Sequence, residues 1–231
     1  MTNTVPPASA RAIELAGHAL WLLPQHAVWH PATRSLFVAD LHLGKAASFR
    51  ALGQPVPSGT TRRNLDRLGA LVAERDPARI VFLGDLLHAV HAQQAAVVDP
   101  LRRWRDAHPS LHCVLVRGNH DSHAGDPPAA LGFEIVDEPW PVAGTARLLA
   151  RHHPLQEPAH AVLAGHWHPA VTLRGPARDH QRLPCFCRIG DLLVLPSFGE
   201  FTGASAQAPP EGATCYPVGG GRVWPGLTKA R

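Results

Sequence analysis

Short apolar runs, each ending in polar side chains, recur along the chain. Each run is built mainly of Val, Ile, Leu, Phe or Ala without strict polar alternation, which is typical of a strand buried on both faces. Asp, His, Asn or Gly follows directly. The runs are SLFVAD (35–40), RIVFLGD (79–85), LHCVLVRGN (111–119), ARLLARHH (146–153) and HAVLAGHWH (160–168). A sixth run, DLLVLPSFGEF (191–201), is also apolar but ends without such a cluster.

A helical period lies between the first two runs. Residues 60–75 have the apolar spacing of an amphipathic helix, and Thr60 or Thr61 is the expected N-cap. Its apolar side is formed by Leu65, Leu68, Leu71 and Val72. A weaker helix is predicted over 92–107, where Pro100 either lies inside the helix or marks its start. Strands alternating with helices predict an α/β architecture.

The remaining segments carry weaker patterns. Residues 175–184 predict a hairpin loop, and the tail from 203, rich in Gly, Pro and Ala, predicts a loop or a frayed edge strand. The chain has 231 residues with no internal repeat or linker, so a single domain over 1–231 is expected. No apolar run approaches the ~20 residues that cross a bilayer, so no membrane association is expected.

Cysteine usage and the N-terminus predict the compartment. The first residues lack a basic region followed by an apolar one, so no secretory signal is expected. Four cysteines are too few and too scattered for a disulfide framework. Cys185 and Cys187 form a C-x-C without a second pair, which favours ordinary thiols over a zinc site. A reducing cytoplasm is the expected location.

Candidate chemistry lies at the strand ends, where open α/β sheets form their sites. The clusters are Asp40-x-His42, Gly84-Asp85 with His88 beyond it, Gly118-Asn119-His120-Asp121, His152-His153 and Gly165-His166-x-His168. Such oxygen and imidazole donors suit Mn²⁺, Fe or Zn²⁺. On extended backbone, the two-residue spacing of D-x-H and H-x-H would point both side chains to the same side. The preceding glycines permit tight strand exits.

Any one cluster is also typical of a capped turn or a surface pair, but five together predict a dinuclear metal site. Two ions ~3.5–4 Å apart need a bridging carboxylate, and Asp85 can bridge. The other predicted ligands are Asp40, His42 and His168 for one ion, and Asn119, His152 and His166 for the second. His120 is predicted to protonate the leaving oxygen or to stabilise the transition state, with Asp121 holding its other ring nitrogen.

The motif order D-x-H, G-D, G-N-H-D, H, G-H-x-H resembles the calcineurin-like metallophosphoesterase superfamily. This resemblance implies a four-layer αββα sandwich of the metallo-dependent phosphatase type, and a metal-bridging hydroxide that attacks phosphorus in line. It supports the ligand roles given above. In the fourth motif His152 aligns best as the ligand, because family members often have a His followed one residue later by Pro; His153 remains a candidate. His88 is either a substrate contact or a bystander.

A narrower resemblance is carried by DLHLGKAASFRALGQPVPSGTT (40–61) together with PSFGEFTG (196–203). These strings are similar to the bacterial PdeM family of ligase-associated DNA damage response endonucleases. The resemblance implies a DNA phosphodiester substrate and DNA-repair partners such as an ATP-dependent DNA ligase. The expected cofactors are two divalent metal ions, with manganese ahead of iron or zinc.

Side chains beyond the ligands bear on the substrate. The net charge of +4 is a mild lean toward anionic partners. Lys45 and Arg50 either contact the substrate phosphate or are solvated charges. Phe49 and Trp167 could stack on a base, although packing under the site is favoured for Trp167. The alternatives to a DNA enzyme are a phosphodiesterase or phosphatase for small substrates such as cyclic nucleotides or nucleotides, and a non-enzymatic binding scaffold. Retention of His120 argues against the scaffold.

Overall fold

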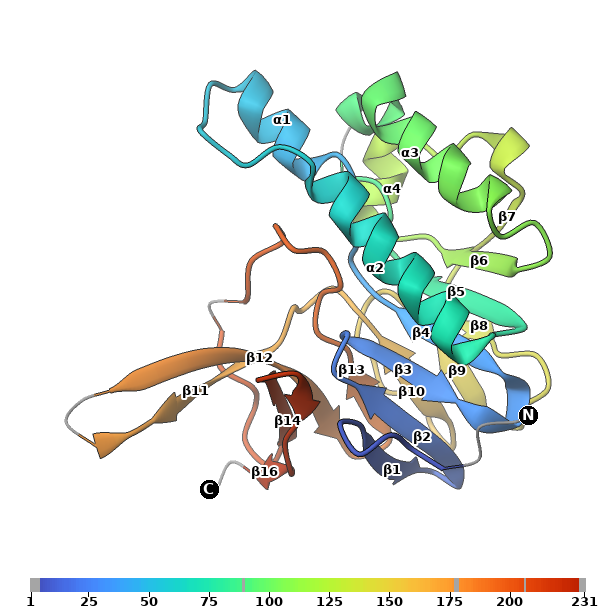
Figure 1. Ribbon diagram of the computed structural model, residues 1–231. Coiled ribbons are helices and arrows are strands. Elements are labelled where there is room, and N and C mark those ends of the chain that lie inside the picture. Colours follow the sequence, from blue (N-terminus) through green and yellow to red (C-terminus); the bar gives the residue numbers. More distant parts are fainter. Residues whose placement is uncertain (1–4, 89, 177–178, 206, 229–231) are drawn as a thin grey trace.

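Two β-sheets pack face to face in the computed structural model of the chain, with α-helices over the outer face of the first sheet (Figure 1). The structure describes residues 5–88, 90–176, 179–205 and 207–228. In the described part of the chain, no helix is long and apolar enough to cross a membrane.

The first sheet follows the order of the chain. Its first four strands pair antiparallel, and the last four pair parallel, so that the carboxyl ends of these last four point to one edge. The strands are β1 (Arg11–Leu15), β2 (His18–Leu23), β3 (Ala27–His30), β4 (Ser35–Val38), β5 (Arg79–Leu83), β6 (His112–Val116) and β7 (Phe133–Val136).

The second sheet is mixed. Its order is β15 (Arg222–Val223), β14 (Thr214–Gly219), β12 (His180–Ile189), β13 (Leu192–Val194), β10 (Ala161–Ala164), β9 (Leu148–Ala150) and β8 (Trp140–Pro141). Outside this order, β11 (Ala170–Arg174) pairs with β12, and β16 (Leu227–Thr228) pairs with β14. The hairpin of β11 and β12 extends away from the body of the sheet (Figure 1).

Helical segments connect the strands of the first sheet. They are η1 (Pro31–Thr33), α1 (Lys45–Ala51), α2 (Thr60–Arg75), η2 (Val90–Gln93), α3 (Ala95–Asp106), α4 (Asn119–Ala124) and η3 (Ala129–Leu131).

The predicted helices are present. Helix α2 buries the predicted apolar side, but its N-cap is Gly59 at φ 78° rather than a threonine, because the chain turns through a left-handed residue there. Pro100 lies inside α3, so the option that it marks the helix start is wrong. Val97 and Val98 are buried ahead of it, and their packing holds the turn that precedes the proline.

Burial on both faces explains the unbroken apolar runs. Along β5, Ile80 and Phe82 pack toward the helices, whereas Val81 and Leu83 pack toward the second sheet. All four side chains are fully buried. A strand with two buried faces cannot alternate apolar and polar residues, and the short runs of the sequence reflect this.

The α/β class and the paired sheets of the metallo-dependent phosphatase fold are confirmed. A second helical layer is not found, because every α-helix of the described residues ends before Gly125. The outer face of the second sheet instead carries a small apolar cluster that includes Cys185, Cys187 and Cys215. All cysteines are buried free thiols.

The expectation for the tail was wrong in part. Strand β14 lies between β12 and β15, although the sequence around it is rich in Gly and Pro. It pairs with β12 from Thr214 to Pro217, and this tertiary pairing overrides the weak local preference. The hairpin predicted over 175–184 is present, since β11 and β12 pair antiparallel, but its loop is shorter than expected because β12 already begins at His180.

Candidate metal centre

Carboxyl ends of strands from both sheets meet at one place. β4, β5 and β6 end there from the first sheet, and β9 and β10 from the second. The backbone N–H of His166 donates to Asp40 Oδ2 over 2.9 Å, which links β10 to the turn after β4. His152 Nε2 lies 3.5 Å from Asp85 Oδ1, which links β9 to β5. The clusters predicted from five separate runs therefore lie side by side.

Left-handed backbone shapes the turns that carry these side chains. The non-glycine residues with positive φ include Asp40 (55°), His42 (45°), Asp85 (51°), His166 (70°) and His168 (45°). Such conformations cost about 1–3 kcal/mol each and gather at functional sites. The expectation that extended backbone aligns each D-x-H or H-x-H pair was wrong, because both members of each pair are left-handed.

Two glycines allow the ligand side chains to approach the neighbouring turns. A Cβ on Gly84, which has φ 78°, would lie 2.2 Å from His152 Nδ1. A Cβ on Gly118 would lie 2.3 Å from Asp85 Oδ1. Real Cβ atoms do not approach so closely. Glycine is therefore required at both positions for the tight turns expected from the G-D and G-N-H-D motifs.

Asp85 occupies the middle of the cluster. Its Oδ1 accepts a hydrogen bond from the backbone N–H of His120 at 2.9 Å and faces His152, while its Oδ2 lies 3.6 Å from His42 Nε2. The side chain is almost fully buried. The two oxygens of one carboxylate thus face two different histidines.

Asp40 provides the test of whether a cation fits. This residue is fully buried, and its Oδ1 has no hydrogen-bond donor. The same oxygen lies 3.6 Å from His168 Nε2 and 3.9 Å from His152 Nδ1. A buried carboxylate oxygen without a donor is costly unless a cation neutralises it. The donor set fits a divalent metal, since Asp40, His42 and His168 place their ligand atoms within 4.8 Å of one another.

His152 anchors the other side of the cluster. Its Nδ1 lies 3.0 Å from the carbonyl of Leu83, and its Nε2 lies 2.9 Å from Asn119 Oδ1 and 3.0 Å from His166 Nδ1. A carbonyl only accepts, so the ring carries its proton on Nδ1. The lone pair of Nε2 then points to the same space as Asn119 Oδ1, which is also an acceptor, and a cation between them would satisfy both.

His153 is arranged differently. Its side chain is 42% exposed, and its Nδ1 donates to Glu138 Oε1 over 2.6 Å. The backbone N–H groups of His152 and His153 both donate to the other oxygen of Glu138, at 2.6 and 2.9 Å. These bonds keep the pKa of Glu138 low despite its burial. Sequence reasoning missed Glu138, because no motif marks a carboxylate that orients a turn from the segment between two other strands, β7 and β8.

The ring of His153 also lies 4.7 Å from that of His166, and His152, His153 and His166 form one group of potential ligands. The sequence did not decide whether His152 or His153 is the ligand. Full burial and contact with both Asn119 and Asp85 favour His152.

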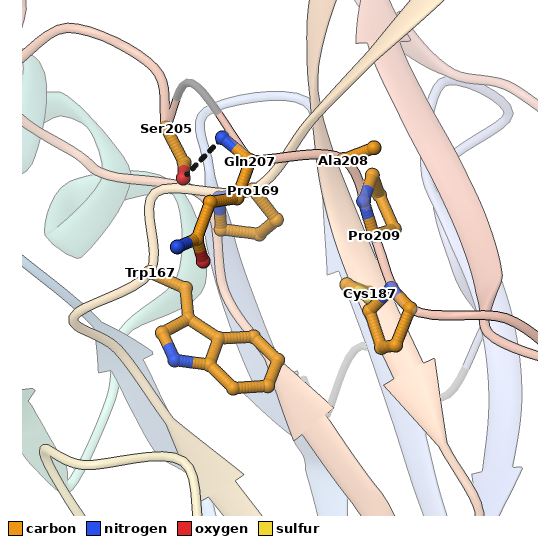
Figure 2. Close-up of a pocket in the computed structure, with 8 residues that line it drawn as sticks. Trp167, Pro169, Cys187, Ser205, Gln207, Ala208 and Pro209 are labelled. Carbon is orange, nitrogen blue, oxygen red and sulfur yellow. Dashed lines mark hydrogen bonds between the residues drawn. The ribbon is translucent and has the colours of Figure 1, made fainter.

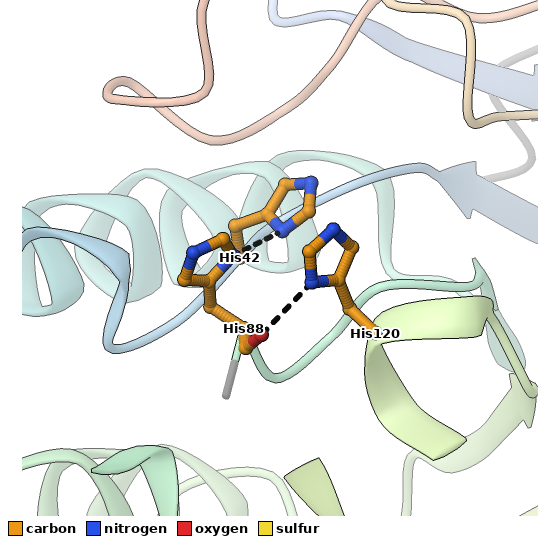
Figure 3. A group of neighbouring side chains, drawn as sticks. All are labelled: His42, His88 and His120. Carbon is orange, nitrogen blue, oxygen red and sulfur yellow. Dashed lines mark hydrogen bonds between the residues drawn. The ribbon is translucent and has the colours of Figure 1, made fainter. Parts of the chain in front are cut away.

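Three imidazoles, His42, His88 and His120, stand together at the side of the cluster that faces the helices (Figure 3). His42 Nδ1 lies 3.1 Å from His88 Nδ1, and His120 Nδ1 donates to the carbonyl of His88 over 2.9 Å. The rings of His88 and His120 stack with centroids 4.8 Å apart. His88 is therefore placed against two predicted site residues.

The predicted role of Asp121 as the partner of His120 is wrong. Asp121 is fully buried, and its two oxygens accept the backbone N–H groups of Leu87 and Gly118, both at 3.0 Å. Its carboxylate is thus used to join the turn after β5 to the start of α4. The carbonyl of His88 takes the orienting role instead. Burial raises the pKa of Asp121 to about 6.

The two predicted cationic contacts differ in position. Lys45 begins α1, and its Nζ donates to the carbonyl of Thr202 over 3.0 Å. Burial lowers the pKa of Lys45, and the charges of Asp85 and Asp40 oppose that shift, which places the ammonium near the cluster. Arg50 lies at the far end of α1, where it donates to the carbonyl of Pro57 and remains exposed.

The loop after β13 supports the cluster, although it carries no ligand motif. Ser197 Oγ and Gly199 N–H both donate to the carbonyl of Asp40, at 3.0 and 3.1 Å. The N–H of Phe198 donates to the carbonyl of Ala39. This loop therefore holds the left-handed turn of Asp40, a function that its composition does not reveal.

Burial keeps the histidines able to bind a metal. It lowers the pKa of His42 and of His166, and neighbouring imidazoles add to both shifts. Burial also lowers the pKa of His88 to about 4, with His120 as the second cause. Neutral imidazoles are the form that coordinates metal ions. Burial raises the pKa of Asp85, whereas the charge of His152 opposes that shift.

Comparisons with known proteins identify the family. Residues 33–154 match the family model of the calcineurin-like phosphoesterases. Nuclease MPE from Pseudomonas putida is 43% identical, with 94% of this chain and 100% of that chain covered and a TM-score of 0.81. Yfce, a phosphoesterase from E. coli, is 15% identical over 84% and 97% of the two chains, with a TM-score of 0.45. No match was found among curated protein sequences.

The family model spans more than half of the chain, and it contains the D-x-H, G-D and G-N-H-D motifs as well as His152. Its matched residues are those that form most of the cluster described above. The chain therefore belongs to the calcineurin-like phosphoesterase family, whose members are metal-dependent phosphoesterases.

Proposed function

We propose that the chain is a dinuclear-metal phosphodiesterase that hydrolyses DNA and works in DNA repair. The observation that carries the two-metal part is Asp85, whose oxygens face His42 on one side and His152 on the other. We name the groups on its two sides the His42 half-site and the His152 half-site. The former consists of Asp40, His42 and His168, and the latter of Asn119, His152 and His166.

The residues around the half-sites have separate tasks. A bound pair of divalent cations polarises phosphoryl oxygens and lowers the pKa of water. His120 donates through Nδ1 to a carbonyl, so Nε2 faces the leaving oxygen and, when both ring nitrogens are protonated, would deliver its proton there. Lys45 adds positive charge beside the carboxylates, where it would offset the charge of a phosphodiester.

DNA as the substrate is supported by the 43% identical neighbour, which is named a nuclease. The positive net charge of the chain agrees with a polyanionic substrate. Manganese as the native metal and an ATP-dependent DNA ligase as a partner stay predictions from the sequence.

A substrate panel tests the proposal. Protein loaded with Mn²⁺, Fe²⁺ or Zn²⁺ is offered DNA oligonucleotides, cyclic nucleotides and phosphomonoesters, and kcat/KM is compared. We expect DNA to be cleaved best, with Mn²⁺ as the most active metal. Efficient cleavage of cyclic nucleotides with inert oligonucleotides would contradict the DNA assignment and favour a small-substrate phosphodiesterase.

A further inference from the structure

Trp167 stands between His166 and His168 in the chain, and its side chain is 36% exposed. The structure therefore differs from the expectation that it packs under the site. The indole forms one wall of a pocket of about 180 Å³, with Pro169 and Gln207 beside it and Cys187 farther across (Figure 2). An exposed aromatic face next to a phosphodiesterase centre is a stacking surface for a nucleobase.

This pocket continues outward along the β11–β12 hairpin. Ala208 and Pro209 line both the Trp167 pocket and a second pocket of about 430 Å³, which also contacts Arg174 and Arg182. A third pocket, of about 520 Å³, shares Arg174 with the second. The three pockets adjoin one another along the hairpin, and the first lies at Trp167, between two predicted ligands; we call this row of pockets the track.

Charge along the track suits a phosphate backbone. Arg174 and Arg182 are both exposed, and neither forms an ion pair with a carboxylate in the described parts of the chain. The cross-strand pairs Thr172–Arg182 and Arg174–His180 place the two guanidiniums two residues apart on adjacent strands. Asp179 is a carboxylate in the lining of the third pocket, at the end of the track farthest from Trp167.

The length of the track suits several nucleotides. β11 starts two residues after His168 and spans Ala170–Arg174. At about 3.3 Å per residue the strand carries the track about 13 Å outward, which is the length of about four stacked nucleotides at about 3.4 Å each.

We propose that this track is a subsite for the substrate strand, where a nucleobase next to the scissile phosphate stacks on Trp167 and phosphates farther along bind Arg182 and Arg174. The proposal rests on the proposed function as a DNA phosphodiesterase and adds to it the path of the strand. Stacking and backbone charge bind a strand without requiring a particular base sequence, so the track confers little sequence specificity.

Oligonucleotides of increasing length test the phosphate part. For the wild-type holoenzyme we expect kcat/KM to rise with oligonucleotide length. For Arg174→Ala/Arg182→Ala we expect the ratio of kcat/KM for the longest and shortest oligonucleotides to be about 10-fold smaller. The double variant should also lower the slope of log(kcat/KM) against log[salt] by about 1.4, since each phosphate contact on a single strand contributes about 0.7.

The matched control is Arg62→Ala/Arg102→Ala, which removes the same charge from exposed positions on α2 and α3. It should retain the length dependence of the wild type. Equal length dependence and equal salt slopes in the two double variants would overturn the track. If the wild type cleaves aryl phosphodiesters but no oligonucleotide, the DNA function itself fails and the track with it.

Trp167 is tested by Trp167→Ala and Trp167→Phe, with bound metal measured in each preparation. We expect Ala to raise KM for a long oligonucleotide about 10-fold with little change in kcat, and Phe to restore most of the loss because it retains a stacking ring. A Phe variant with full metal content that is no better than Ala would overturn the stacking role.

Discussion

His42 and His152 face opposite oxygens of Asp85, but their second ring nitrogens meet different partners. His152 Nδ1 faces the carbonyl of Leu83, a backbone group fixed inside β5. His42 Nδ1 faces His88 Nδ1, a side-chain atom on a ring that can turn. A metal-bound imidazole is oriented by what its other nitrogen touches. The His152 half-site is thus built rigidly by the sheet, whereas the His42 half-site depends on a neighbouring side chain.

Burial does not follow the same division. His152 is completely buried, but His166 of the same half-site is not, whereas Asp40 and His42 are both buried. The contrast between the half-sites therefore lies in what orients each ring. It teaches that one carboxylate can join a preformed site to an adjustable one, and that the two ions should not bind with equal strength.

Replacing Asp85, the carboxylate shared by the two half-sites, should remove metal binding from both and with it the difference between them. We expect Asp85→Asn to lose both metal ions and at least about 10³-fold in hydrolysis of an aryl phosphodiester, because each half-site loses an anionic oxygen. Metal content by elemental analysis and kcat/KM measure the effect. The control is Asp66→Asn, a change at an exposed position of α2. A variant that keeps one tightly bound ion would show that Asp85 serves one half-site only.

His120 should affect turnover without affecting either half-site. His120→Asn removes the Nε2 proton donor, while the backbone N–H that donates to Asp85 remains. We therefore expect kcat to fall about 10²–10⁴-fold with both metal ions retained. Loss of one ion in this variant would show that His120 is a metal ligand, and the His42 half-site would then have to include it.

His88 probes the adjustable half-site directly. We expect His88→Ala to weaken binding of one metal ion about 10–100-fold, because His42 loses the group that orients its Nδ1. Competition with a chelator, followed by counting the ions that remain, measures this. The ion of the His152 half-site should stay bound, and the wild type should release its two ions at different chelator concentrations. Simultaneous release in both proteins would contradict unequal half-sites.

The strand ends could be predicted because their chemistry is local. Each apolar run and the polar residues after it are contiguous in sequence, and parallel strands bring such ends to one edge. The helix over 60–75 was predicted with its bounds, since its apolar spacing is regular. The predicted ligand set rests on these signals and the motif order, and it stays a prediction.

Other parts depend on partners that are distant in sequence. Glu138 holds the His152–His153 turn from the segment between β7 and β8, and the carboxylate of Asp121 bonds two backbone N–H groups instead of His120. Strand β14 forms because β12 offers it an edge, not because its own residues favour extension. Long-range hydrogen bonds of this kind leave no periodic mark in the sequence, so spacing arguments cannot recover them.

The smallest expected effect concerns the loop that supports the Asp40 turn. Ser197→Ala removes the hydroxyl that donates to the carbonyl of Asp40, while Gly199 N–H still donates to the same oxygen. We expect a loss of about 1 kcal/mol in the free energy of unfolding, the usual contribution of one such hydrogen bond, measured by urea denaturation of the metal-free protein. Because Asp40 belongs to the His42 half-site, the variant should weaken that ion and leave the other unchanged. An equal weakening of both ions would mean that the Asp40 turn supports the whole cluster and that the two halves are not independent.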